Sequence, residues 1–466
     1  MDNQQRSGEV HEVREGHDVR EVRDWQGRRF RVGEDPRTLL AGRSRTSILW
    51  QAGLAMAAIG VLQYGYGAAV PALMERNGWT LAEAFWPLAI WTVFQAGVGF
   101  PIAYLRQRGW VGPRVLMLMG AILCEVGLLT LAHVPSSLGV LVGYSVVGGT
   151  GAGLVYAVCT STIAKWYPER GAAAVGSITG AFAYGSVPVV IASVVALDAS
   201  SWLPALDIAA VVMFLLIAIS GLLFVDPPAR WWPAAVEPRR WSLGTEPRRG
   251  RRRNPPAVRE FSAPQALRTR ALPAMVLILL CAGAVSLFDA AFLVVLARGM
   301  GADAALIALA VGLLVGVNGS SRAMAVGVSE RIGRCRAIGL VLAVLAAGQV
   351  LIAVALGTGS AVSLAAAATV AGLGGGGFYP LFAGLAREYF GEDSAAEVHG
   401  IVYSAKAGSG LLGVGLGVLA VLAWGAPATF LLAGGVAALS AWGATALRRP
   451  GLPNTLPPLS APGRAA

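Results

Sequence analysis

Lys406 lies in the stretch IVYSAKAGSG, residues 401–410, at the start of a long apolar segment. Arginine carries nearly all the positive charge of the chain, and the only other lysine is Lys165. A lysine near the centre of a membrane span costs roughly 2.5–3.5 kcal/mol on insertion scales. Tyr403 and Ser409 lie three residues before and after Lys406, so the three share one helical face. We therefore expect Lys406 to face an aqueous cavity and not lipid.

Arg322 is a second cation in an apolar segment, with Asn318 four residues before it on the same polar stripe. Two cations about 8 Å apart repel by roughly 2 kcal/mol at an effective dielectric near 20. A small dianion between them reverses the sign, because Arg offers a planar fork to one carboxylate and Lys a point charge to the other. The pair predicts a carboxylate substrate, most naturally a short dicarboxylate. The alternative is that each cation snorkels to the interface or pairs with a carboxylate in the membrane.

Other polar and aromatic residues in the apolar segments extend this hypothesis. The carboxylates are Glu125, Asp207 and Asp289. Glu125 is expected to lie deepest and is the candidate for proton coupling or for pairing with a membrane arginine, while the other two are expected near the outer interface. Gln63 and Gln95 offer hydrogen bonds. The candidates for the aromatic wall of the cavity are Tyr64, Tyr66, Tyr156 and Tyr184, each with packing or an interfacial position as the alternative.

These residues lie in blocks of about 20 apolar residues, the length that spans roughly 30 Å of hydrocarbon as a helix. The 466 residues have a mean hydropathy of +0.62 and only 14% charged residues, against about 25% in a typical soluble chain. We predict an all-α membrane protein with twelve transmembrane helices. They are expected at 47–74, 85–105, 115–134, 138–164, 172–196, 203–225, 272–297, 304–328, 337–357, 360–386, 401–424 and 426–447.

A segment rich in Pro and Arg, residues 226–271, divides these spans six and six and reads as a flexible cytoplasmic linker. The remaining predicted parts are a cytoplasmic, disordered polar extension, two six-helix halves and a cytoplasmic tail, at 1–46, 47–225, 272–447 and 448–466. The arginines gather in alternate loops, so both termini are expected in the cytoplasm. The same clustering accounts for the net charge of +11 without nucleic acid as a partner.

Four stretches carry a resemblance to a known family: NGSSRAMAVGVSERIGR, AKWYPERGAAAVGSITGAFAYG, GGGGFYPLFAGLAREYFG and GIVYSAKAGSGLLG. Over residues 47–447 the chain resembles the major facilitator superfamily, and more narrowly its oxalate:formate antiporter and monocarboxylate carrier branch. The resemblance implies that superfamily's fold, with Arg322 and Lys406 as the substrate-binding cations. It also implies that Tyr403 and Tyr379 line the cavity and that a cytoplasmic loop motif comprises Glu330, Arg331, Gly333 and Arg334.

Departures from the family pattern bear on the mechanism. Proton-coupled monocarboxylate carriers are similar too, but they typically carry an Asp four residues before the eighth-helix arginine and a lysine in the first helix. Here the first position is Asn318, and residues 47–74 contain no lysine, which favours exchange. The first-half loop GFPIAYLRQRGWVGPR also lacks the acidic residue of the loop motif.

We therefore predict a secondary carrier of the inner membrane that exchanges small organic anions, mono- or dicarboxylates, by alternating access. Its expected partners are the anion and membrane lipid, and it is expected to act as a monomer. The absence of a G-x-x-x-x-G-K-[ST] loop, H-E-x-x-H or G-x-S-x-G predicts neither a cofactor nor enzymatic activity. The alternatives are a proton-coupled monocarboxylate symporter, a drug efflux carrier, or a non-transporting sensor that uses its polar extension and linker.

Overall fold

A computed structural model describes residues 19–23, 29–233, 253–255 and 257–451. Within these residues, twelve helical segments are long and apolar enough to cross a membrane, as the sequence predicts. The first six are α2 (Arg45–Asn77), α3 with α4 (Leu81–Gly97, Gly99–Gln107), α5 (Pro113–His133), α6 with α7 (Ser137–Val140, Gly149–Trp166), α8 with α9 (Gly171–Tyr184, Val187–Ala196) and α10 (Trp202–Leu222). A π-helical segment, Leu141–Gly148, joins α6 to α7, and a short 3-10 turn, Pro168–Arg170, precedes α8.

The second six spans repeat this plan. They are α13 (Ala271–Gly299), α14 (Ala304–Ile332), α15 (Arg334–Thr358), α16 with α17 (Ala361–Gly376, Phe378–Phe390), α18 with α19 (Ala395–Gly410, Gly417–Trp424) and α20 (Ala426–Thr445). A π-helical segment, Leu411–Leu416, joins α18 to α19. A short helix, α12 (Ala263–Leu267), precedes α13.

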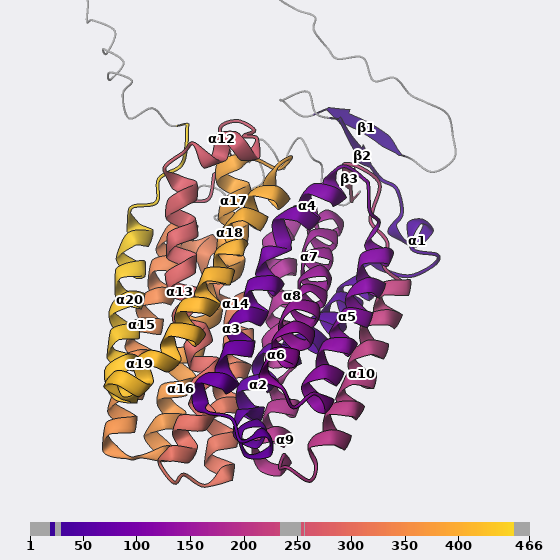
Figure 1. Ribbon diagram of the computed structural model, residues 1–466. Coiled ribbons are helices and arrows are strands. Elements are labelled where there is room, and N and C mark those ends of the chain that lie inside the picture. The colour runs from indigo at the N-terminus through magenta and orange to yellow at the C-terminus, as the bar shows by residue number, and fades with distance from the viewer. Residues whose placement is uncertain (1–18, 24–28, 234–252, 256, 452–466) are drawn as a thin grey trace, which may run out of the picture.

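The two halves stand side by side with their helices along one common direction (Figure 1). They meet mainly where α14 packs on α8, α13 on α2, and α18 on α3. We call the end of the molecule that carries α12 and the start of α2 the linker side, and the opposite end the far side. Large apolar side chains remain exposed on the outer faces, which suits a lipid environment; among them are Trp50, Val212, Leu277 and Trp442.

Small residues let the helices that carry polar side chains approach closely, as is usual in membrane bundles. In α16, a Cβ added at Gly376 would lie 2.0 Å from the backbone oxygen of Asn318 on α14. The run of glycines in α16 therefore brings α14 within direct backbone contact. That contact holds Asn318, and Arg322 one turn later, against the interior of the second half.

The structure differs from the predicted disorder of residues 1–46 in the part that it describes. Strands β1 (Arg20–Arg23) and β2 (Arg29–Val32) pair antiparallel, and β2 pairs parallel with β3 (Trp231–Trp232) of the linker. A short helix, α1 (Pro36–Leu39), follows. The backbone hydrogen bonds of this sheet and the two buried tryptophans of β3 order both segments. Residues 1–18 and 24–28 lie outside the described residues, as do 234–252, 256 and 452–466.

The linker also docks on the second half in the parts that are described. The side chain of Asn254 accepts from Arg334 N and donates to the backbone oxygen of Ser329 at 3.0 Å. The rings of Phe261 and Phe390 contact edge to face with centroids 5.7 Å apart. These contacts tie the described linker residues to the bundle, whereas the sequence predicts a flexible linker.

Candidate functional site

Lys406 lies well inside its span, on α18, and its residue is only 2% exposed. Its Nζ donates to Gln63 Oε1 on α2 at 2.6 Å and to Gln95 Oε1 on α3 at 2.9 Å. Both acceptors come from the first half, whereas Lys406 belongs to the second. The ammonium thus bridges the two halves through neutral amide oxygens.

Arg322 on α14 is equally buried, at 2% exposed. Its Nη1 donates to the backbone oxygen of Thr179 on α8 at 2.7 Å, and its Nη2 donates to Tyr64 Oη and Asn318 Oδ1, each at 3.2 Å. Its Nε, although buried, has no hydrogen-bond partner among the described residues. The guanidinium therefore keeps a free donor inside the protein, which is unusual because buried polar groups are normally paired.

The two cations share a central position. The ring of Phe182 on α8 lies near both cations: its centroid is 5.2 Å from Lys406 Nζ and 6.0 Å from the Arg322 guanidinium carbon. Within the described part of the chain, neither cation forms an ion pair with a carboxylate. Their environment holds only neutral acceptors and aromatic faces, which stabilise a cation less than a charged partner does.

Tyrosines from both halves close the cluster. Tyr156 on α7 stacks on Tyr403 on α18, and the Arg322 guanidinium lies 5.2 Å from the ring centroid of Tyr379 on α17. Tyr64 donates to Asn318 Oδ1 at 3.2 Å. A small cavity lies here, lined by Gln63, Tyr156, Phe182, Arg322, Tyr379, Tyr403 and Lys406. The structure thus brings together seven of the residues that the sequence analysis names as substrate-binding: Arg322, Lys406, Tyr403, Tyr379, Asn318, Tyr64 and Tyr156.

Three other named residues lie away from this cluster. Tyr66 comes two positions after Tyr64, which turns it to the opposite side of α2, and its hydroxyl donates to the backbone oxygen of Ala84. Tyr184 is 43% exposed, and its hydroxyl donates to the backbone oxygen of Ser177. Glu125 on α5 is half-buried and forms neither an ion pair nor a hydrogen bond within the described chain. Tyr64 and Tyr66 are two residues apart on one helix and therefore face different sides of it. Their shared residue type does not reveal this difference.

Phe182 and the backbone oxygen of Thr179 are parts of the cluster that the sequence analysis does not name. An apolar ring in an apolar span gives no signal, and neither does a backbone carbonyl. The sequence does single out Gln63 and Gln95, because an amide side chain in an apolar span needs a hydrogen-bond partner. Lys406 supplies it.

The two halves contact each other on both sides of the cavity. On the linker side, Arg387 Nη2 donates to the backbone oxygen of Pro168 at 3.2 Å, and Arg108 pairs with Glu397 at 3.9 Å. On the far side, the rings of Phe85 and Phe292 stack with centroids 4.1 Å apart. Contacts between the halves thus lie on both sides of the cluster, and its two cations are buried.

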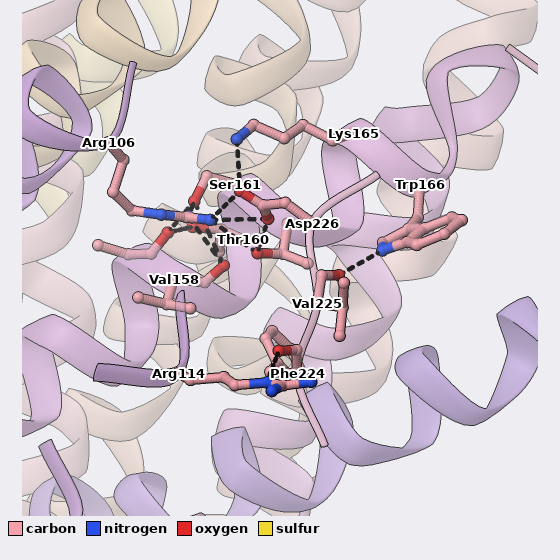
Figure 2. A network of polar contacts seen from close by, with 12 residues as sticks. Arg106, Arg114, Val158, Thr160, Ser161, Lys165, Trp166, Phe224, Val225 and Asp226 are labelled. Atoms are coloured by element: carbon pink, nitrogen blue, oxygen red, sulfur yellow. Dashed lines mark hydrogen bonds and ion pairs between the residues drawn. The ribbon is translucent and has the colours of Figure 1, made fainter. Parts of the chain in front are cut away.

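Arg106, at the end of α4, is the centre of a polar network on the linker side (Figure 2). Its Nη2 donates to both carboxylate oxygens of Asp226 at 2.8 Å and to Thr162 Oγ1 at 2.9 Å, and its Nη1 contacts Ser161. Lys165 Nζ also donates to Asp226, at 2.7 Å. Burial raises the pKa of the Asp226 carboxyl, but the charges of Arg106 and Lys165 outweigh it and hold this pKa below its usual value. Asp226, at the start of the linker, thus supplies an acidic partner that the first-half loop itself lacks.

The loop motif of the second half builds a similar arrangement. Gly333 ends α14 with a positive φ of 97°, which favours glycine, and it sets Arg334 at the start of α15. Arg334 Nε donates to Glu388 Oε1 at 3.0 Å, and its Nη1 contacts Ser329 Oγ. Glu330 and Arg331 are exposed. In each half, one buried arginine on the linker side joins a hydroxyl and a carboxylate.

The comparisons with known proteins agree with this architecture. The sequence profile of the Major Facilitator Superfamily matches residues 52–327 and 274–463. The chain belongs to the major facilitator superfamily. Its members are transporters and not enzymes, so the chain is a multi-pass membrane transporter, as the sequence predicts. A solved structure of the nucleoside transporter NupG (D323A mutant) superposes with a TM-score of 0.60 at 12% identity, over 86% of this chain and 99% of that one. It shares the fold.

Curated relatives within the superfamily are distant. The oxalate:formate antiporter of Oxalobacter formigenes is 23% identical over 381 residues, which cover 81% of this chain and 85% of that protein. Monocarboxylate transporter 11 of Mus musculus is 28% identical over 136 residues, 28% of this chain and 30% of that protein. An uncharacterized 38 kDa protein of Thermoproteus tenax is 28% identical over 398 residues, 85% of this chain and 93% of that protein. The predicted resemblance to the oxalate:formate antiporter and monocarboxylate carriers is confirmed.

Proposed function

We propose that this transporter exchanges small organic anions, mono- or dicarboxylates, and that Arg322 and Lys406 bind them. The observation that carries the proposal is a pair of buried cations that line one cavity, neither of which has a carboxylate partner within the described chain. The Nε of Arg322 adds a buried donor that has no hydrogen-bond partner within the described chain. The relatives named for oxalate, formate and monocarboxylates support the same class of substrate.

An efflux carrier for amphipathic cations fits this cavity poorly. Such a substrate would need carboxylates as the principal charges of its site, whereas the seven lining residues include two cations and no acid. A bound dianion, in contrast, would neutralise the pair. Arg322 would give the planar fork and Lys406 the point charge, and the stacked tyrosines would exclude water around them.

Exchange follows from the cost of closing an empty site. Two cations without a counter-ion must enter a low-dielectric space, which costs several kcal/mol per ion even after relaxation. The amide oxygens of Gln63 and Gln95 offset part of this cost at Lys406. A bound anion offsets more, so the loaded carrier should change sides faster than the empty one. The halves would rock about the central site.

We also propose an orientation in the inner membrane. The linker side carries most of the positive charge of the loops, including Arg106, Arg108, Arg331 and Arg336, whereas the far-side loops carry Arg76 and Arg298. The positive-inside rule then puts the linker side and both termini in the cytoplasm. The complete site lies within one chain, so a monomer surrounded by lipid suffices for transport.

The test is efflux of labelled oxalate from proteoliposomes at neutral pH, with or without unlabelled oxalate or formate outside. External anion should accelerate efflux strongly. A panel of longer mono- and dicarboxylates, offered outside in turn, would then define the substrate. Equal efflux rates with and without every external anion would overturn the exchange proposal.

A further inference from the structure

Asp289 is a buried carboxyl group that the proposed anion site does not use. It lies on α13 between the central cluster and the far-side contact of Phe85 with Phe292, and it is 2% exposed. Gln349 Nε2 on α15 donates to Asp289 Oδ2 at 2.7 Å. Within the described chain, Asp289 Oδ1 and Gln349 Oε1 are both buried without a hydrogen-bond partner. One pair of side chains thus contains two acceptors that lack a donor.

One proton would satisfy both atoms. A carboxylic acid and a primary amide can form a closed pair, in which the amide N–H donates to one carboxyl oxygen and the acid O–H donates to the amide oxygen. Gln349 already supplies the first of these bonds. A proton on Asp289 Oδ1 supplies the second, and it also removes an uncompensated negative charge from the interior of the bundle.

Among the residues that the structure describes, no cation pairs with Asp289 to stabilise its ionised form. The elements packed on α13 are α2, α12, α14, α15, α16, α17, α18, α20 and the π-helical segment Leu411–Leu416; α12 and the π-helical segment contain no ionisable residue. Helices α16 and α20 contain hydroxyl groups but no ionisable side chain. The arginines of α15 lie at its linker-side end. The interior ionisable groups of the other helices are Tyr64, Tyr66, Arg322, Tyr379, Tyr389, His399, Tyr403 and Lys406. Tyr66 bonds to Ala84, and Tyr389, which contacts Cys335, and His399 lie nearer the linker-side ends of their helices. The others belong to the central cluster.

We propose that Asp289 and Gln349 form a proton-binding site. The proton comes from water and returns to water when the far side opens, because Phe85 and Phe292, whose contact closes that side, belong to different halves. Ser286, one turn before Asp289, donates to the backbone oxygen of Gly375 at 2.8 Å and lies 3.5 Å from Asn318 Nδ2. Asn318 in turn bonds to Arg322. This row of polar groups places the proton-binding site close to the proposed anion site.

A consequence for transport rests on the proposed function. If the closed carrier holds both an anion and the proton, each anion crosses together with one proton. During exchange the proton crosses in both directions, so the net proton flux is zero. Net uptake of an anion would instead carry a proton inward. Proton binding and anion exchange are thus compatible in one carrier.

The test uses infrared spectroscopy of the purified full-length protein in lipid at neutral pH, with no substrate. Asp289→Asn is the diagnostic variant, because its amide can both accept from and donate to Gln349 and so retains the pair without a titratable proton. The wild type should show a protonated-carboxyl C=O band that Asp289→Asn loses. Asp207→Asn is the matched control; its carboxylate pairs with His133 at 2.8 Å and is partly exposed, so the band should persist. An unchanged protonated-carboxyl C=O band in Asp289→Asn would show that Asp289 is ionised in the wild type and overturn the proposal.

Gln349→Met provides a second readout that does not depend on Asp289→Asn folding. It removes the amide and leaves the acid without its partner, so the same C=O band should shift in frequency. An unshifted band would overturn the acid–amide pairing. Neither spectrum requires a transported substrate, so failure of this proposal is distinguishable from failure of anion exchange.

Discussion

Tyr156 and Tyr403 stack face to face with ring centroids 4.6 Å apart and ring planes 14° apart. Tyr156 belongs to the first half and Tyr403 to the second, so the stack joins the halves at the wall of the central cavity. A rocking movement that opens one side must break or shear this contact. The stack therefore stabilises the closed carrier and not the open forms.

Each exchange cycle passes through the closed carrier, so removing one ring of the stack that stabilises this form should slow exchange. An aromatic pair contributes about 0.5–1.5 kcal/mol beyond the area that it buries, so Tyr156→Ala should lower the exchange rate by about 2- to 13-fold. Tyr156→Phe keeps the ring and should stay near the wild-type rate. Labelled oxalate exchange in proteoliposomes measures both. Equal slowing by Ala and Phe would assign the effect to the hydroxyl and not to the stack.

Neutralising either cation should abolish most transport while the protein still inserts. Hydrogen bonds to charged groups contribute about 1.5–3 kcal/mol, so Lys406→Gln and Arg322→Gln should each weaken oxalate binding by about 10- to 150-fold. Lys406→Arg should also be poor, because a planar fork does not replace a point charge. Arg76→Gln, at an exposed arginine of the far side, is the control and should exchange normally. Near-normal uptake by both Gln variants would contradict the site assignment.

Breaking the Arg106–Asp226 pair should destabilise the linker side. The Arg106 side chain is 3% exposed, and removing one partner of a buried pair costs about 3–5 kcal/mol. Asp226→Asn should therefore lower the melting temperature clearly. The control is Asp393→Asn, whose half-exposed pair with Arg230 at 3.8 Å should contribute only about 0–1 kcal/mol. Thermal unfolding of the purified carriers, followed by tryptophan fluorescence, would separate them.

The same carboxylate should make stability depend on pH in acid. The folded pKa of Asp226 lies below its usual value of 3.8, so the unfolded chain binds a proton more readily than the folded one. Its contribution is thus fully present above about pH 4 and is lost as the pH falls through the lowered folded pKa. The melting temperature of the wild type should fall towards that of Asp226→Asn over this range. A constant gap between the two proteins down to the lowest pH would contradict the ion pair.

Trp231 should anchor both the linker and the described part of the N-terminal extension. It is 3% exposed, its ring contacts Trp166 at 5.1 Å, and its Nε1 donates to the backbone oxygen of Glu34 at 3.1 Å. Truncating a buried tryptophan typically costs about 3–5 kcal/mol, so Trp231→Ala should lower the melting temperature. Trp424→Ala, at an exposed position on the outer face, should change it little. Proteolysis near residues 29–34 should also become faster only in Trp231→Ala.

The sequence by itself determined the features that depend on residues close together in the chain. Span length and hydropathy gave twelve helices near their observed bounds, and the three- and four-residue spacing placed Tyr403 beside Lys406 and Asn318 beside Arg322. Local periodicity encodes these relations, because one helix fixes which residues share a face. The rarity of lysine and the polar stripes then sufficed to name both cations.

Tertiary packing decided which residues from other helices meet them. Gln95 and Lys406 are 311 residues apart, and no spacing rule links them. Phe182 contacts both cations although its type gives no signal, and the phase of α2 decides that Tyr64 joins the cluster while Tyr66 does not. The sequence predicts an interfacial position for Asp289, whereas the packing of α15 places Gln349 against its buried carboxyl group. Such contacts depend on how twelve helices pack, which follows from the shapes of many side chains together and not from any one segment.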